Sequence, residues 1–209
     1  MPDPMPDATE QRPYHHGNLR TELLDAAERS LRTHGVEQLS LRDLARDIGV
    51  SHAAPRRHFA DRRALLDALA ESGFVRLGAK LRAAVDEIDD EDDLPARLHA
   101  FASAYVRFAT ENAALTGLMN SSKHRPGATS VAEAAAAAFG QISDLIEEGQ
   151  ARGELEEGDP EDIGLIIYAT VLGITSMLNS GMIEPGRLEG LVDTAVTQFL
   201  RGARPTEPR

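Results

Sequence analysis

The chain has 209 residues, of which 42% are hydrophobic and 27% charged, so it is long and apolar enough for one or two compact domains. This composition excludes a disordered or fibrous protein. Cysteine is absent, which excludes disulfides, thiolate metal sites and thiol nucleophiles. There is no apolar run of 18 residues, and the proline-rich start lacks the pattern of a signal peptide. We therefore expect a soluble, cytoplasmic protein.

The net charge of −12 is distributed unevenly along the chain. Residues 10–80 hold 12 Lys or Arg and 10 Asp or Glu, together with five of the seven histidines. Residues 81–209 hold 10 Lys or Arg and 22 Asp or Glu. An acidic body repels phosphates, so any anion-binding face is expected in the first eighty residues.

Three helices are predicted in the first sixty residues. The first runs from about Asn18 to His34, and the second is a short helix that follows Ser40. Ser40 and Asp43 form a capping-box pattern at the start of this second helix. After a break at Gly49-Val50, Ser51 is placed to cap a third helix that ends near Phe59.

The rest of the chain is also predicted to be helical, with no convincing alternating strand. A long helix capped by Asp61 runs to about Val85, and the acidic stretch 86–93 is a solvated boundary. Four or five further helices follow. Those with clear bounds are 95–112, 130–149, 160–180 and a last amphipathic helix after Pro185-Gly186. The predicted fold class is all-α.

The segment from Ser40 to Phe59 has the pattern of a helix-turn-helix unit. A small residue, Ala45, lets the two helices approach closely, and Gly49 gives the turn its backbone freedom. Such units place their second helix in the major groove of DNA. Helix–glycine–helix turns also occur in all-helical proteins that bind no DNA, but the clustered Arg and His side chains at 52–58 favour DNA binding.

Residues 15–75 resemble the N-terminal domain of TetR-type bacterial transcription regulators. The resemblance is carried by HHGNLRTELLDAA and GVSHAAPRRHFADRRALLDAL. It implies an N-terminal three-helix helix-turn-helix domain joined by a long helix to a C-terminal effector and dimerisation bundle. The corresponding division is a flexible arm at 1–17, a DNA-binding domain at 18–64, a ligand-binding and dimerisation domain at 65–203 and a tail at 204–209. Beyond residue 75 only the helix pattern matches the family.

The resemblance implies a set of DNA contacts on and around the recognition helix. Arg56 stands where the family usually has tyrosine, and Pro55 where leucine or valine is more common. Arginine can bond either a phosphate or a guanine. The predicted DNA-binding residues are Arg42, Ser51, His52, Ala53, Arg56, Arg57, His58 and Arg62.

An N-terminal arm and an effector pocket are two further candidates. The arm, Tyr14 to Arg20, either lies along the DNA or is a frayed terminus. Aromatic residues on 95–112, facing the helix at 130–149, either line an effector cavity or form plain core. These candidate pocket residues are Phe101, Tyr105, Phe108, Phe139 and Ile142. His124 and Arg125 lie on a loop and are not assigned to a site.

The last two helices are predicted to form a four-helix interface with a second copy of the chain. The helix from Ile163 to Leu178 has more apolar surface than one face of a monomer can cover. The alternatives are burial of both helices within one subunit, or a membrane span, which the length and the acidic approach Glu161-Asp162 disfavour. The predicted interface residues are Ile167, Val171, Ile174, Leu191, Val192, Ala195 and Phe199.

No catalytic or metal-binding motif is present, so we predict no enzyme, no metal and no cofactor. The neighbours His15 and His16 cannot easily share one ion, and the acidic stretch 86–93 lacks the glycine of a calcium loop. The predicted function is a nucleoid-associated, ligand-responsive repressor. It would bind a near-palindromic DNA operator as a homodimer, away from any membrane, and an unknown small-molecule effector would release it. The alternatives are a helical small-molecule-binding protein that does not bind DNA, and a helix-bundle enzyme.

Overall fold

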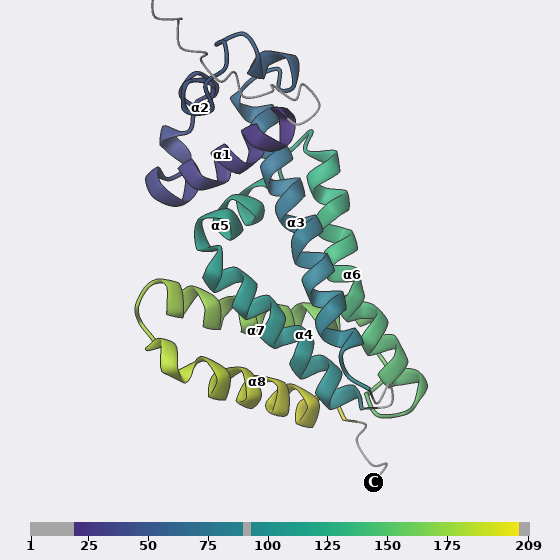
Figure 1. Ribbon diagram of the computed structural model, residues 1–209. Helices are drawn as coiled ribbons and strands as arrows, with labels where there is room; N and C mark the ends of the chain where they lie inside the picture. The colour runs from purple at the N-terminus through teal and green to yellow at the C-terminus, as the bar shows by residue number, and fades with distance from the viewer. Residues whose placement is uncertain (1–18, 90–92, 205–209) are drawn as a thin grey trace, which may run out of the picture.

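The computed structural model describes residues 19–89 and 93–204, and within these ranges it contains eight α-helices and no strand. The all-α prediction is confirmed. Figure 1 shows α1 and α2 at one end of the molecule, α7 and α8 across the other, and the long helices α3 and α6 side by side between them. We call residues 19–61 the head and residues 94–204 the body; α3 joins the two.

The head begins with α1 (Leu19–His34), followed by a short 3-10 turn, η1 (Val36–Gln38), and by α2 (Leu41–Asp47). Gly35 ends α1 with a φ of +79°, a conformation that glycine adopts without steric cost. Leu23 and Ala27 of α1 and Ala45 of α2 are fully buried. The sequence predicted that the small Ala45 lets α2 and the segment after Gly49 approach closely, and Ala45 is buried in the head.

The N-terminus of α2 is capped as predicted. Ser40 Oγ accepts a hydrogen bond from the backbone N–H of Asp43 (3.1 Å) and donates one to the Asp43 carboxylate (2.6 Å). The bond from Ser40 lowers the pKa of Asp43, and Arg46 contributes in the same direction. Gly49, with a φ of +74°, then ends α2 and reverses the chain so that the next segment lies beside α2. This geometry fixes how the next segment leaves the helix.

The predicted third helix is wrong in form. Between Ser51 and Phe59 the chain makes only turns and one 3-10 helix, η2 (Pro55–Arg57). If Ser51 capped an α-helix, residue 55 would donate the first i→i−4 bond to its carbonyl. Proline has no N–H for this bond, and its ring crowds that carbonyl. The segment instead closes with i→i−3 bonds, such as Ala54 N to Ser51 O (3.0 Å).

Helix α3 (Arg62–Asp86) starts at the predicted cap, where Asp61 Oδ1 accepts from Ala64 N (2.8 Å). It packs against α4 (Leu94–Glu111), α5 (Ala113–Ser122) and α6 (Thr129–Ala151). Sequence analysis did not resolve α5 as an element. Only Asn112 separates α5 from α4. Since no proline or glycine marks the break, the sequence does not show where α4 ends and α5 begins.

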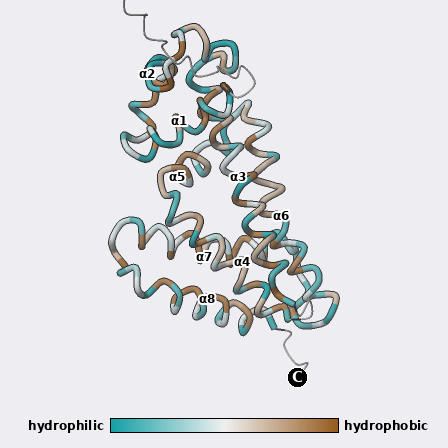
Figure 2. The backbone as a smooth tube through the Cα atoms, in the orientation of Figure 1, coloured by the Kyte–Doolittle hydropathy of each residue, from teal (hydrophilic) through white to brown (hydrophobic). Residues whose placement is uncertain are grey.

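The body ends with α7 (Pro160–Asn179), η3 (Pro185–Arg187) and α8 (Leu188–Gly202). A Cβ on Gly78 of α3 would lie 3.3 Å from Cα of Ala138, so these small residues let α3 and α6 approach closely. Gly164 brings α7 close to α6 in the same way, against Ile142. Hydrophobic and hydrophilic residues alternate within the turns of α8 (Figure 2), as its amphipathic sequence predicted.

Candidate nucleic-acid interface and effector pocket

The head exposes nearly all of the predicted DNA-binding side chains. Seven of them are exposed to solvent on α2, on η2 and on the turns beside η2. These residues are Arg42, Ser51, His52, Ala53, Arg56, Arg57 and His58. They are brought together because Gly49 folds the 51–58 segment back beside α2.

The cations of this surface differ in their acidic partners. Arg46 pairs with Asp43 (2.8 Å) and also approaches Asp47, so its charge is largely neutralised. In the described part of the chain, Arg42, Arg56 and Arg57 form no ion pair, although the charge of Arg42 acts on the neighbouring Asp43. These three guanidiniums are free to bond a phosphate or a base edge.

Arg62 has a structural role in the head, and its predicted phosphate contact stays a prediction. It is half-buried, and its Nε donates to the carbonyl of Leu39 (2.8 Å) while Nη2 donates to that of Val36. Both carbonyls follow α1, so Arg62 ties the first turn of α3 to the head. The spacing of the sequence could not show this, because the partners are 23 and 26 residues away.

Phe59 is buried, with 3% of its surface exposed, so it belongs to the core of the head. Arg20 lies on it, with Cζ 5.6 Å from the ring centroid. Residues 14–18 of the predicted arm lie outside the described residues. The start of α1 is therefore held by the same aromatic ring that anchors the end of the 51–58 segment.

The family comparisons agree with this geometry. Residues 23–69 match the model of the bacterial regulatory proteins of the tetR family, and residues 98–199 match that of the tetracyclin repressor-like C-terminal domain. The chain belongs to the TetR family. It is a DNA-binding transcription regulator, which accords with the free cations of its head.

Three individual proteins show how far the similarity to this TetR-family regulator extends. A protein of unknown function from Rhodococcus sp. RHA1 is 46% identical, covers 93% of this chain and 100% of its own, and has a TM-score of 0.86. The TetR-family regulator PfmR from Thermus thermophilus is 21% identical, covers 86% of this chain and 97% of its own, and has a TM-score of 0.67, which shows the shared fold. The nucleoid occlusion factor SlmA of Idiomarina loihiensis is 30% identical over 102 residues, about half the length of either chain.

In the body of the regulator, four of the five predicted pocket residues surround one cavity between α4, α6 and α7. They are Phe101, Tyr105, Phe139 and Ile142. The cavity encloses about 10 Å³, roughly the room for a single water molecule, so the helices are closed on one another here. Phe108 does not line it. It lies two helical turns from Phe101 and faces a separate groove between α3, α4 and α8.

Aromatic rings fill the space around this cavity. The centroids of Tyr105 and Tyr168 are 5.5 Å apart in an edge-on contact, and those of Phe139 and Tyr168 are 4.6 Å apart. Tyr105 is 2% exposed, and its hydroxyl makes no bond of normal hydrogen-bond geometry, although the Tyr168 side chain lies close enough to interact with it. Burial, with a smaller contribution from Tyr168, raises the pKa of Tyr105 far above its usual range, so the group stays a neutral donor. An unpaired buried hydroxyl costs roughly 1–3 kcal/mol of stability.

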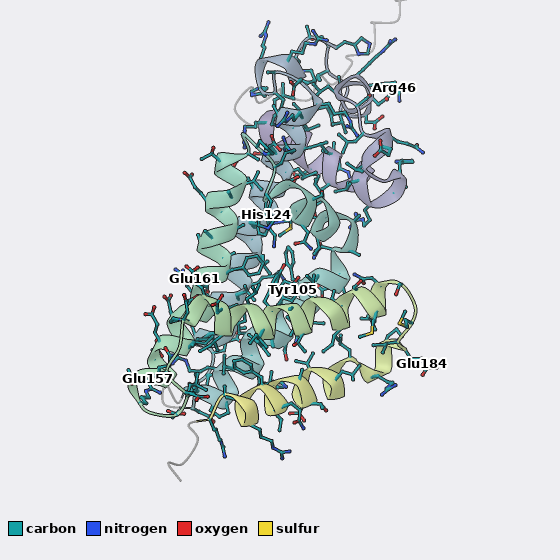
Figure 3. All side chains as sticks on the ribbon, turned by 180° about the vertical axis from the view of Figure 1, so that it is seen from behind. Arg46, Tyr105, His124, Glu157, Glu161 and Glu184 are labelled. Atoms are coloured by element: carbon teal, nitrogen blue, oxygen red, sulfur yellow. The ribbon has the colours of Figure 1, made fainter. Side chains whose placement is uncertain are left out.

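Three residues at one end of this cluster were not predicted from the sequence: Asn120, Lys123 and Tyr168. Lys123 Nζ lies 3.4 Å from Tyr168 Oη, 5.0 Å from the Tyr168 centroid and 5.4 Å from that of Phe139. Tyr168 Oη is also 3.4 Å from Asn120 Oδ1. One feature of the sequence could have drawn attention to Lys123: it is one of only two lysines among 22 basic residues. Figure 3 shows Tyr105 behind α7 and His124, the residue after Lys123, closer to the head.

The predicted dimer interface needs correction. Four of its residues, Ile167, Val171, Ile174 and Val192, are buried inside the monomer. Ile167 and Val171 of α7 lie beside residues of α4 and α6, whereas Val192 belongs to α8 and lies beside residues of α3 and α4. The exposed apolar side chains of α7 are Leu165 (59%), Ile166 (63%) and Met177 (36%), on the opposite side. Leu191, Ala195 and Phe199 of α8 are partly exposed.

Proposed function

We propose that this TetR-family regulator is a ligand-responsive repressor in the cytoplasm, associated with the nucleoid. It binds a near-palindromic operator as a homodimer, and a small-molecule effector bound in the body releases it. The observation that carries the proposal is the set of exposed, unpaired guanidiniums on the head of an otherwise acidic protein. An acidic body repels DNA, so the phosphates meet the protein only at this face.

The contact surface is centred on the turn at 51–58 rather than on a long recognition helix. Arg56 and Arg57 project from η2, and Ser51 and His52 precede it on the exposed turn. A 3-10 turn is slimmer than an α-helix and presents few side chains, so base contacts would be few and phosphate contacts relatively important. Arg62 supports this surface from behind by bonding Leu39 and Val36.

The apolar outer face of α7 supports a dimer. The outer face of α7 exposes Leu165, Ile166 and Met177. By length and composition alone, this helix is apolar enough to cross a membrane. The acids Glu161 and Asp162 in its first turn, and its packing against α4 and α6, instead favour a surface covered by a second copy. A two-fold dimer would set the two heads on half-sites about 34–36 Å apart, or a multiple of that spacing.

Two contacts link the body to the head through α3. Arg125, on the loop before α6, forms an ion pair with Asp67 in the second turn of α3. Arg63 in the first turn donates to the carbonyl of Pro126 (2.8 Å) on the same loop. Movement of this loop would pull on α3 where Arg62 clamps the head. Such coupling is typically worth roughly 1–3 kcal/mol, a change of about 5–150-fold in operator affinity.

Selection of bound fragments from random duplex DNA tests the proposal. The enriched sequences should contain two inverted half-sites, with centres separated by about one helical turn or a multiple of it. Affinity for the selected duplex should fall as salt rises, because each phosphate contact releases counterions. Enrichment of a single asymmetric site, or no enrichment at low salt, would contradict the proposal.

A further inference from the structure

The aromatic cluster around Tyr168 has a composition that core packing alone does not explain. Its walls are apolar, yet one end carries a buried hydroxyl and an ammonium. A plain core would place aliphatic carbon there, because each polar group loses hydration on burial. The cluster therefore resembles a ligand site that has closed on itself.

The polar groups at this end are mainly hydrogen-bond donors. Tyr105 Oη makes no bond of normal hydrogen-bond geometry. Lys123 Nζ has three N–H donors, of which one reaches the Tyr168 hydroxyl in a long hydrogen bond (3.4 Å), and its charge otherwise lies over two aromatic rings. No carboxylate in the described part of the chain pairs with Lys123, whereas the neighbouring Arg125 is paired with Asp67. The missing chemical group is an acceptor with negative charge.

We infer that the effector is a small apolar carboxylic acid whose carboxylate binds Lys123 and the Tyr105 hydroxyl. Its hydrocarbon part, aromatic or aliphatic, lies between Phe101, Phe139 and Tyr168. This inference rests on the effector site of the proposed function and names the ligand class. The carboxylate gives Lys123 an ion pair in place of its contacts with the rings, and it gives Tyr105 the acceptor that it lacks.

The closed cavity, about 10 Å³, requires the site to open when this acid binds. Lys123 has to leave the faces of Phe139 and Tyr168 to admit the hydrocarbon part. Lys123 is the C-terminal cap of α5 and precedes the loop that Arg125 ties to α3. Binding of the acid therefore displaces the element that the proposed coupling requires to move.

Direct binding to the full-length protein, without DNA, tests the ligand class. Isothermal titration calorimetry at pH 7 would compare 3-phenylpropanoate and octanoate with 3-phenylpropanamide and octanamide. Tyrosine fluorescence supplies a second readout, since the chain has three tyrosines, two of them in the cluster, and no tryptophan. We expect at least one acid to bind at least tenfold more tightly than its amide. The two acids distinguish an aromatic from an aliphatic hydrocarbon part.

The variant Lys123→Met should remove this tenfold preference, and Lys123→Arg should retain most of it. The matched control is Lys80→Met, which alters the chain's other lysine, exposed on α3, and should change nothing. Circular dichroism checks that each variant is folded. Equal affinity for acid and amide, a preference that survives Lys123→Met, or no binding of either acid at millimolar concentration would overturn the inference.

Tyr105→Phe separates a ligand-binding role from a structural one. The variant should bind the preferred acid about five- to tenfold more weakly, yet its thermal midpoint should rise because an unpaired buried hydroxyl is removed. A lower midpoint with unchanged acid affinity would contradict the role given to Tyr105. Failure of the proposed function has a different result: the acids bind with the expected preference but do not release the selected duplex.

Discussion

The head and the body carry their functional groups in opposite ways. In the head, Arg56 and Arg57 are exposed on a 3-10 turn, and the buried residues beneath them, such as Phe59 and Ala45, only hold the turn in place. In the body, Tyr105 is buried and the cavity beside it is closed. The head is therefore ready to meet a large rigid ligand, whereas the body must rearrange to admit a small one. A regulator needs both properties, because the effector has to change the shape of the protein to change its DNA affinity.

The largest effect is expected from the outer face of α7, because the proposed dimer positions both heads on the DNA. Ile166→Asp would place a charge in the proposed interface twice, once from each subunit. We expect the dimer to weaken by about 4 kcal/mol, or roughly a thousandfold in Kd, measured by analytical ultracentrifugation. Val75→Asp is the control, because Val75 is equally exposed (61%) but lies on α3. An unchanged dimer would place the interface elsewhere.

The exposed cations of the head should carry the next largest effect. Arg57→Ala should lower affinity for the selected duplex by about 1–3 kcal/mol, or roughly 5–150-fold, and should reduce the salt slope by about one if the contact is a phosphate. Fluorescence anisotropy at two salt concentrations measures both quantities. Arg204→Ala, an exposed arginine of the tail, should leave them unchanged. If the two variants behave alike, the contact face is wrongly assigned.

The joint between head and body is tested by Asp67→Asn, which leaves Arg125 without its carboxylate. Both side chains are about three-quarters buried, so we expect a loss of roughly 1–2 kcal/mol in the free energy of unfolding. Hydrogen exchange should become faster in the loop 123–127 and in the first turns of α3. The control Asp162→Asn changes an exposed acid on α7. Unaltered exchange in the loop would show that the ion pair does not hold it.

The smallest expected effect concerns the cap of α2, which positions the turn at 51–58. Ser40→Ala removes both hydrogen bonds to Asp43 and should cost about 1 kcal/mol at pH 7 in urea unfolding. Ser130→Ala, at an exposed serine in the first turn of α6, should cost little. The pKa of Asp43 is lowered in the folded protein. The stabilisation that its charge provides is therefore present above the unfolded value of about 3.8 and is lost as the pH falls through the folded pKa. The difference in stability between the wild type and Ser40→Ala should narrow at low pH but not vanish, because the bond from the Asp43 N–H does not titrate. A constant difference would mean that the Asp43 charge contributes nothing.

Much of this protein was determined by local sequence. Helix periodicity, the caps at Ser40 and Asp61, and the glycines at 35 and 49 fix where helices begin and end, because these signals depend on neighbours only a few residues away. The exposed DNA-binding surface was predictable for the same reason, since its residues lie within one short segment. The 3-10 form of that segment was visible in principle, through Pro55.

Only the tertiary structure decided the rest, because those properties depend on which residues meet across long separations. It buried Ile167 and Val171 and exposed Ile166 on α7. This helix is apolar nearly all round, so its sequence periodicity does not show which side is buried. It placed Arg62 in hydrogen-bond contact with the head and Arg125 in an ion pair with Asp67 of α3. It also brought Lys123 over rings from α6 and α7, and left the Tyr105 hydroxyl buried without an acceptor.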